Sequence, residues 1–343
     1  MKPVSGTFTV GAAGGGEGGF TLDPRRLAVL RELRRRGTLA ATAEALHLTP
    51  SAVSQQIAAL AREAGAPLTE RAGRGVRLTG QARILLDHAD RIAAQLERAR
   101  TDLAAYEQGA RGTITIGAFS SGILGLLPAT LRTLAEQLPE VEVRVVEAQP
   151  PDVFTALDAG QIDLVVAVDF AATPPHTDRR YTRTDLLTDI LDLALPPGHP
   201  LAATPAPALR DLATERWIVG DAASCCGAVT RSVCAAAGFT PDIRHEIDDW
   251  ASVAALVGAG AGVALMPRLV QEILQRRELP LRTLAAPGCA SPSRNVFAAV
   301  RAGAEANPVL TEVVAALRQA ADEQRARTAA GRQDVVTWTA MRP

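Results

Sequence analysis

The sequence is short of cysteines, of aromatic residues and of long apolar runs, and these shortages exclude several classes of protein. Four unevenly placed cysteines in 343 residues are too few for a disulfide framework. No segment approaches the run of roughly 18 apolar residues that a membrane-spanning helix requires. The first 20 residues carry one basic side chain, Lys2, ahead of GAAGGGEGG, and lack the apolar core of a signal peptide. We therefore expect a cytoplasmic protein with a flexible Gly-rich extension over residues 1–20.

Signatures of catalysis and of metal binding are missing as well. The sequence contains neither a GxSxG motif nor a Walker-type loop, and its Gly-rich stretch precedes any predicted strand, so it is no phosphate cradle. The histidines have no metal-ligand spacing: they are His47, His88, His176, His199 and His245. These absences predict no enzyme activity, no cofactor and no metal site.

The charge of the chain is unevenly distributed. Its length and its 47% hydrophobic and 21% charged residues predict a globular protein with more than one core. The formal net charge is −1, yet residues 21–80 hold ten arginines against five acidic residues, which leaves the remainder acidic. A basic end on an acidic chain favours a polyanion as partner of that end, although a basic solvated surface is the alternative.

The basic segment has the pattern of three short helices. Leucines recur at helical spacing over residues 24–36, and Gly37 is a natural stop. Thr38 is placed to cap a second, alanine-rich helix. Thr49 and Pro50 are suited to the N-cap and first position of a third. Two short helices joined by a tight turn predict a helix-turn-helix.

The third helix predicts a DNA-reading surface. Its apolar stripe of Val53, Ile57 and Leu60 leaves small and amide side chains on the opposite face, where they can approach base edges and exchange hydrogen bonds with them. A two-stranded wing with arginines at 71, 74 and 77 is expected over residues 67–79. A plain amphipathic helix is the alternative for the third helix. The candidate DNA-binding residues are Thr38, Thr49, Ser51, Ser54, Gln55, Gln56, Arg62, Arg71 and Arg74.

A heptad pattern follows the wing. Apolar residues alternate at spacings of four and three from Leu78 to Tyr106. A stripe this narrow buries well only against another helix, so a dimerisation helix is expected over residues 81–108, with packing on its own domain as the alternative. The residues expected at the dimer contact are Leu85, Ile92, Leu96 and Leu103.

The rest of the chain alternates strands with helices. TITIGAF, VEVRVVEA and IDLVVAV have strand patterns and are separated by helical segments, and a second series of the same kind runs to GVALMP. The pattern then returns to the strands LRTL and RNVFAAV and to a helix over residues 308–321. This alternation predicts a mostly parallel α/β fold.

The stretches LRRRGTLAATAEALHLTPSAVSQQIAAL and GAPLTERAGRGVRLTGQA resemble the DNA-binding part of the LysR-type transcriptional regulators, and the resemblance continues to about residue 321. Ala61, Thr69 and Ala82 depart from that pattern, which places the fine packing of the wing in question. The resemblance implies an α/β protein with an N-terminal all-α winged helix-turn-helix, a linker helix and a two-lobed periplasmic-binding-protein-like (type 2) effector domain. It also implies a bacterial homotetramer built from homodimers, and partners that are promoter or operator DNA, a small-molecule effector and, for an activator, RNA polymerase.

Domain boundaries follow from the patterns and the resemblance together. The DNA-binding domain is expected at 21–80 and the effector domain at 112–321. Within the effector domain, lobe I is expected to comprise 112–170 and 266–319, and lobe II 171–265. A tail is expected over residues 322–343.

Two lobes bound a cleft, where a small effector is expected to bind. The candidates are polar or aromatic residues at the junctions between strands and helices, although helix capping alone also explains a Ser or Asp at such a position. They are Ser120, Ser121, Asp169, Phe170, Ser224, Cys225 and Asp249. A cytoplasmic solute-binding protein that sequesters its ligand is the alternative function.

A thiol redox sensor is a further alternative for the trigger. Cys225 and Cys234 have a spacing similar to that of peroxide-sensing members of the family. Nine residues of helix rise about 13.5 Å, too far for a disulfide unless the helix unwinds. A position at a helix N-terminus nevertheless favours a lowered pKa for the Cys225 thiol.

Overall fold

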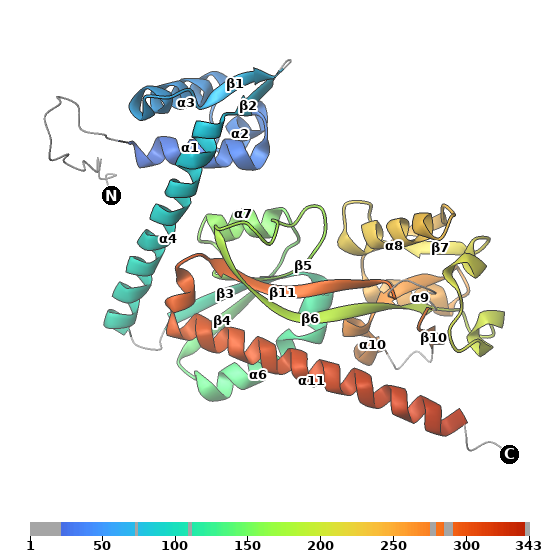
Figure 1. Ribbon diagram of the computed structural model, residues 1–343. Helices are drawn as coiled ribbons and strands as arrows, with labels where there is room; N and C mark the ends of the chain where they lie inside the picture. Colours follow the sequence, from blue (N-terminus) through green and yellow to red (C-terminus); the bar gives the residue numbers. More distant parts are fainter. Residues whose placement is uncertain (1–21, 73–74, 109–111, 275–278, 285–290, 340–343) are drawn as a thin grey trace, which may run out of the picture. The chain divides into compact units, whose positions relative to one another are not determined.

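The computed structural model describes residues 22–72, 75–108, 112–274, 279–284 and 291–339, and the chain divides into two compact units, Met1–Leu96 and Glu97–Pro343 (Figure 1). The first unit holds helices α1 (Pro24–Arg36), α2 (Leu39–Ala45) and α3 (Pro50–Ala64), strands β1 (Thr69–Ala72) and β2 (Gly75–Leu78), and the first part of α4 (Gly80–Gln108). Among the described residues, no helix is both long enough and apolar enough to cross a bilayer.

Local signals set the helix ends in the first unit. The Asp23 carboxylate accepts a hydrogen bond from the Arg25 amide at the start of α1, and Gly37 ends that helix with a φ of 73°. The hydroxyls of Thr38 and Thr49 cap α2 and α3. Side chains at these positions satisfy amides that have no partner within the helix, so the local sequence determines where each helix begins.

The turn between α2 and α3 is formed by His47, whose φ of 53° is left-handed. The Leu48 amide donates to the Ala43 carbonyl at 2.8 Å, which closes the C-terminus of α2. A left-handed residue followed by a bond back across the last turn is the Schellman arrangement. This turn directs α3 away from α2 and leaves its outer face exposed.

Helix α4 serves two purposes along its length. Ala82, Leu86 and Ala89 are buried in the core of the first unit, and Leu85 is half-buried against the same core. Leu85 thus packs partly on its own domain, and its contact with a second copy stays a prediction. Further along α4 three apolar side chains of the seam are exposed: 52% of Ile92, 57% of Leu96 and 65% of Leu103.

The second unit is built on a seven-stranded sheet. Its order is β10-β6-β11-β5-β3-β4, with β9 also paired to β6. The parallel strands are β3 (Gly112–Ala118), β4 (Val141–Glu147) and β5 (Leu164–Val168), and the antiparallel strands are β6 (Tyr181–Ala194), β9 (Ala264–Pro267), β10 (Leu281–Arg282) and β11 (Ser293–Arg301).

Helices cover both faces of this sheet (Figure 1). Helices α5 (Ser120–Gly125), α6 (Leu127–Gln137) and α11 (Pro308–Thr339) lie on one side, and α7 (Asp152–Asp158) lies on the other. Strand β5 is buried on both faces and reads as the continuous apolar run LVVAV.

A second core completes the unit. It is formed around the parallel pair β7 (Arg216–Val219) and β8 (Asp242–Glu246), with the second half of β6 and helices α8 (Cys225–Ala236), α9 (Trp250–Gly258) and α10 (Arg268–Leu274). Short 3-10 turns occur at Pro200–Ala203, Leu209–Leu212 and Ala304–Ala306.

The lobes do not divide where the sequence predicted. Strand β6 belongs to both: Leu187 lies in the first core, and Leu191 lies in the second. Met266 and Leu284, which were expected in lobe I, lie in the second core. The reason is that β6 and β11 run continuously from one lobe to the other, so neither lobe boundary falls in a loop.

The C-terminal helix is longer than predicted. Helix α11 continues past Ala321 to Thr339, where a tail was expected. Gln324 in the extension is only 6% exposed, and Arg325 donates a hydrogen bond to the Leu186 carbonyl of β6. Contacts with the sheet thus continue along α11 for at least one turn beyond Ala321.

Candidate nucleic-acid interface and effector cleft

The outer face of α3 carries unengaged polar side chains. Ser51, Ser54, Gln55 and Arg62 lie on this face, and all four are exposed. Gln55 has no hydrogen-bond partner among the described residues, so both its donor and its acceptor groups are available. This face has the geometry that base-edge contacts in a major groove require.

Three other predicted DNA-binding residues already form hydrogen bonds within the protein. The Gln56 side-chain oxygen accepts from Arg26 Nε at 3.2 Å, and Arg26 also pairs with Glu63 on α3. The hydroxyl oxygens of Thr38 and Thr49 accept bonds from helix amides. Gln56 is therefore held by a contact between α1 and α3, and the two threonines position helix starts.

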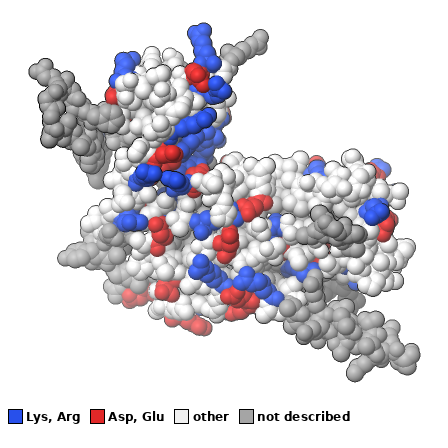
Figure 2. All heavy atoms as spheres, in the orientation of Figure 1, with Lys and Arg blue, Asp and Glu red and all other residues white. Residues whose placement is uncertain are grey.

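The wing is a short antiparallel hairpin. Thr69 pairs with Leu78 at its base, and Arg77 forms an ion pair with Glu70 across the two strands at 2.9 Å. Arg71 is exposed and has no partner among the described residues, whereas Arg74 lies outside them. Figure 2 shows further basic side chains over this unit, which supports a polyanion partner.

Asp90 fixes α4 to α1. Its carboxylate is buried and accepts hydrogen bonds from Arg31 at 3.0 Å and from Arg34 at 2.8 Å. Two of the basic residues counted in the sequence are therefore partly neutralised within the fold, and they contribute less to an electrostatic surface than the charge count implied.

A hollow in the second unit is lined by residues of both lobes. Five of the expected effector residues line it: Ser120, Ser121, Phe170, Ser224 and Cys225. Its volume is about 30 Å³, which is space for about two water molecules. The structure thus describes a closed cleft.

Two expected residues lie elsewhere. Both carboxylate oxygens of Asp169 bind Arg183 at 2.6 Å, and Asp249 accepts a bond from the Ser252 amide at the start of α9. Neither lines the closed hollow, so their contact with an effector stays a prediction. Asp248 and Trp250, which flank Asp249, line it instead, because adjacent residues at a helix start point in different directions.

A buried cation behind the cleft was not anticipated from the sequence patterns. Arg294, at the start of β11, has a side chain that is 2% exposed, and its partner Asp189 on β6 is fully buried. The guanidinium donates to Asp189 at 2.8 and 3.1 Å, to Ser121 Oγ at 2.6 Å and to Cys226 Sγ at 3.0 Å. Four separate elements, β11, β6, α5 and α8, therefore meet at one charge.

This arrangement keeps the guanidinium ionised. Burial alone lowers the pKa of Arg294, but the neighbouring Cys226 thiol and Asp189 carboxylate outweigh burial, and the pKa is raised. Because Arg294 occupies the acceptor side of the Ser121 hydroxyl, the hydroxyl proton is available to an acceptor in the cleft.

Cys225, Cys226 and Cys234 are buried and weakly acidic. Burial raises the pKa of the Cys225 thiol even though Arg294 acts in the opposite sense, so the lowered pKa expected at a helix N-terminus is wrong. Burial also raises the pKa of Cys226 and of Cys234 to about 12. The described residues contain no group of three or more His, Cys, Asp and Glu side chains that could hold a metal ion.

Comparison with known proteins identifies the family. Residues 24–83 match "Bacterial regulatory helix-turn-helix protein, lysR family", and residues 107–322 match "LysR substrate binding domain". The chain is 28% identical over 297 residues to the HTH-type transcriptional regulator MetR of Escherichia coli, covering 87% of this chain and 90% of MetR. It is 31% identical over 250 residues to a probable hydrogen peroxide-inducible genes activator of Mycobacterium avium, covering 71% of this chain and 78% of that protein.

Solved structures share the fold. A peroxide-bound mutant of Corynebacterium glutamicum OxyR aligns with a TM-score of 0.58 and 19% identity over 90% of this chain and 95% of that one. Full-length CbnR in complex with its target DNA aligns with a TM-score of 0.51 and 22% identity over 88% of this chain and all of the other. The chain belongs to the LysR family of transcriptional regulators, with an N-terminal DNA-binding domain and a C-terminal effector-binding domain.

Proposed function

We propose that this regulator reads its operator with the outer face of α3 and holds the flanking phosphates with Arg62 and the wing. The observation that supports the proposal is that Gln55 is exposed and has no partner among the described residues, beside two exposed serines. An amide side chain with free donor and acceptor groups can form the bidentate contact that distinguishes adenine in a major groove. Arg71 carries charge without such geometry, and it contributes to every duplex equally.

Two substitutions separate these roles. Gln55→Ala is expected to weaken binding to DNA flanking the protein's own gene by about 1–3 kcal/mol per half-site and to leave random duplex unaffected. Arg71→Ala is expected to weaken both duplexes alike and to reduce the salt dependence of binding. Arg132→Ala, a substitution on α6 in the other unit, is the matched control. Equal losses on specific and random DNA for Gln55→Ala would contradict the assignment.

The effector proposal concerns the closed cleft. The ligand is a small molecule with a carbonyl or carboxylate oxygen that accepts the Ser121 hydroxyl proton. Ser120, Ser224, Gln149 and Asp248 supply further polar contacts. A hollow of about 30 Å³ is too small for such a molecule, so the lobes separate on binding.

Thermal unfolding of the full chain in the presence of small carboxylates tests the cleft. A ligand is expected to raise the unfolding temperature of the wild type, and Ser121→Ala is expected to reduce that shift. Thr188→Val, an exposed change on β6 away from the hollow, is the control. A ligand whose stabilising effect is the same in Ser121→Ala and in the wild type does not bind as proposed.

We further propose that the protein acts in the cytoplasm as a homodimer through the exposed part of α4, that two dimers form a tetramer, and that an activating member contacts RNA polymerase. The exposed apolar side chains of Ile92, Leu96 and Leu103 support the dimer. A sequestering protein without a DNA target is the alternative. It would show no steep salt dependence on duplex DNA.

A further inference from the structure

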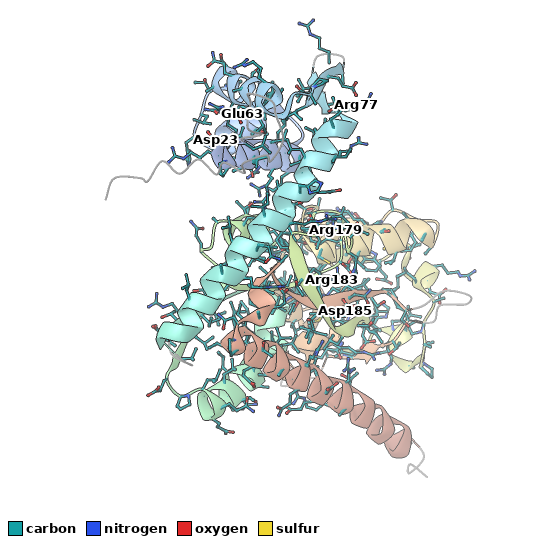
Figure 3. All side chains as sticks on the ribbon, turned by 60° about the vertical axis from the view of Figure 1, so that its left-hand side comes forward. Asp23, Glu63, Arg77, Arg179, Arg183 and Asp185 are labelled. Atoms are coloured by element: carbon teal, nitrogen blue, oxygen red, sulfur yellow. The ribbon has the colours of Figure 1, made fainter. Side chains whose placement is uncertain are left out.

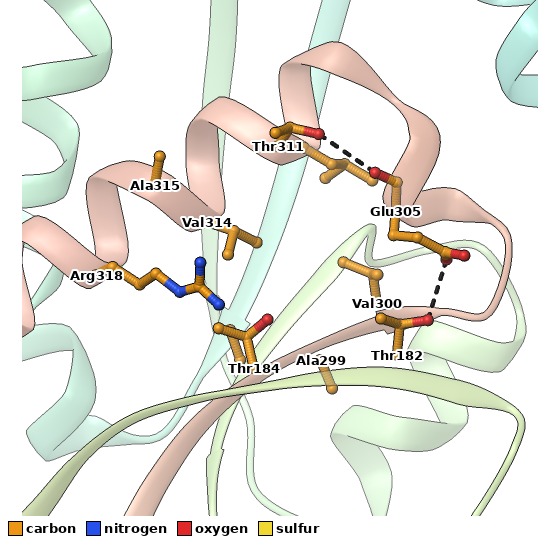
Figure 4. Close-up of a pocket in the computed structure, with 11 residues that line it drawn as sticks. Thr182, Thr184, Ala299, Val300, Glu305, Thr311, Val314, Ala315 and Arg318 are labelled. Carbon is orange, nitrogen blue, oxygen red and sulfur yellow. Dashed lines mark hydrogen bonds between the residues drawn. The ribbon is translucent and has the colours of Figure 1, made fainter.

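A second pocket lies in the effector unit, between α11 and the strands β6 and β11 (Figure 4). Its volume is about 200 Å³, several times that of the closed cleft. None of its lining residues also lines the cleft. It is therefore a separate site.

The floor of this pocket is apolar. Ala298 and Val300 on β11 are 1% and 4% exposed, and Leu310 on α11 is 3% exposed. Val314, one turn further along α11, is half-buried beside them. These side chains can cover a compact hydrocarbon body of a ligand without leaving any polar group unsatisfied.

The two ends of the pocket differ in charge. At one end the Glu305 carboxylate accepts hydrogen bonds from Thr182 Oγ1 at 3.1 Å and from the Gly303 amide, and it lies 3.5 Å from Arg98. That end is already satisfied by protein groups. At the other end Arg318 extends from α11 toward Thr184 of β6, as Figure 4 shows.

The side chains of Arg318 and Thr184 have no hydrogen-bond or ion-pair partner among the described residues. A guanidinium and a hydroxyl that converge on one end of an apolar pocket form the donor pair that a carboxylate accepts. The opposite end repels an anion, because Glu305 is negative. A ligand is thereby oriented with its carboxylate at Arg318 and its apolar body over Val300 and Leu310.

We propose that this pocket binds a small monocarboxylate with a compact apolar body, independently of the ligand in the cleft. Arg318 pairs with the carboxylate, Thr184 donates a hydrogen bond to it, and the apolar floor covers the rest. Because α11 contacts β6 along its length, a ligand held between them also stiffens the strand that crosses from one lobe to the other.

Calorimetric titration of the full chain with cyclohexanecarboxylate tests the site, and cyclohexanecarboxamide is the uncharged probe of the same shape. The carboxylate is expected to bind the wild type, and the carboxamide is expected to bind at least about tenfold more weakly. Arg318→Gln is expected to lower the affinity for the carboxylate about tenfold or more, and Thr184→Val is expected to lower it less. Neither side chain has a hydrogen-bond or ion-pair partner among the described residues, so neither change is expected to disturb the fold.

Two control variants locate the binding. Arg327→Gln removes another arginine of α11, one that does not line the pocket, and Ser121→Ala alters the cleft. Both are expected to bind the carboxylate with wild-type affinity. No binding to the wild type at roughly 10 mM, unchanged affinity in Arg318→Gln, or an equal loss in Ser121→Ala overturns the proposal. The last of these outcomes would assign the probe to the cleft instead.

Discussion

Replacing Asp189 by Asn tests the energetic role of the buried ion pair. The substitution keeps the size of the side chain and one acceptor oxygen but removes the charge that faces Arg294. Both side chains are almost completely shielded from water, and the remaining acceptors, Ser121 Oγ and Cys226 Sγ, are neutral. Removing one partner of such a pair costs about 3–5 kcal/mol, because it leaves an uncompensated buried charge. We expect about 3 kcal/mol, since Asn retains one hydrogen bond.

The tryptophans make this measurement selective. All three tryptophans of the chain lie in the second unit, and Trp217 and Trp250 are buried in the second lobe. Denaturant unfolding followed by their fluorescence therefore reports the effector unit within the full chain, separately from the DNA-binding unit.

A matched carboxylate on the same strand provides the control. Asp185 pairs with Arg183 at 3.1 Å, but its side chain is 67% exposed (Figure 3). Asp185→Asn is expected to change stability by no more than about 0.5 kcal/mol. The apolar double variant Asp189→Leu with Arg294→Met is expected to recover much of the loss. If Asp189→Asn costs no more than Asp185→Asn, the reasoning about a shielded charge is wrong.

Three further predictions concern other features. Replacing both Ile92 and Leu96 with Asp is expected to remove roughly 4–6 kcal/mol of stabilisation from apolar burial, summed over two copies. The dimer is then expected to be lost in sedimentation experiments, and a dimer that persists would exclude this seam as the interface. Thiol alkylation at pH 8 is expected to be slow at Cys225 and Cys226, because burial raises the pKa of both thiols; rapid labelling, or a crosslink after mild peroxide that alters operator affinity, would restore the redox interpretation. Burial acts to raise the pKa of Asp192, but hydrogen bonds from Arg268 and its neighbours outweigh burial and lower it. The ionised Asp192 therefore contributes its full stabilisation at pH values above its unfolded-state pKa of 3.8, and this contribution is lost as the pH falls through the lower pKa of the folded state. Asp192→Asn is thus expected to reduce the fall in the free energy of unfolding that is measured between about pH 6 and 2.

Local features of the first unit were predictable because local chemistry determines them. Asp23, Thr38 and Thr49 cap helices through bonds that span two or three residues, and Gly37 ends α1 with a left-handed backbone. The heptad pattern was less informative. It predicts one apolar stripe along α4, but it does not say that Leu85 meets its own domain.

Long-range features of the second unit were not predictable in the same way. The alternation in β6 shows that the strand is buried but not that its two halves serve different cores. Likewise, Asp189 and Arg294 are 105 residues apart, and nothing in the sequence of either strand identifies the other as its partner. In the sequence, helix capping explains Ser224 and Asp249 as readily as ligand binding does. The structure distinguishes them: both cap helices, but only Ser224 also lines the cleft.

The two strands that cross between the lobes suggest how a ligand can act on this structure. The pairing of β11 with β6 is continuous except at Val296 and Phe297, where the register shifts. A bulge is a place where a strand bends with little loss of pairing, so separation of the lobes is expected to concentrate there. If bending at this point moves α5 away from α8, Arg294 can no longer bind both Ser121 on α5 and Cys226 on α8. An effector that accepts a hydrogen bond from Arg294 replaces the lost contact. It therefore binds the open form more tightly than the closed form, as any ligand-driven change in conformation requires.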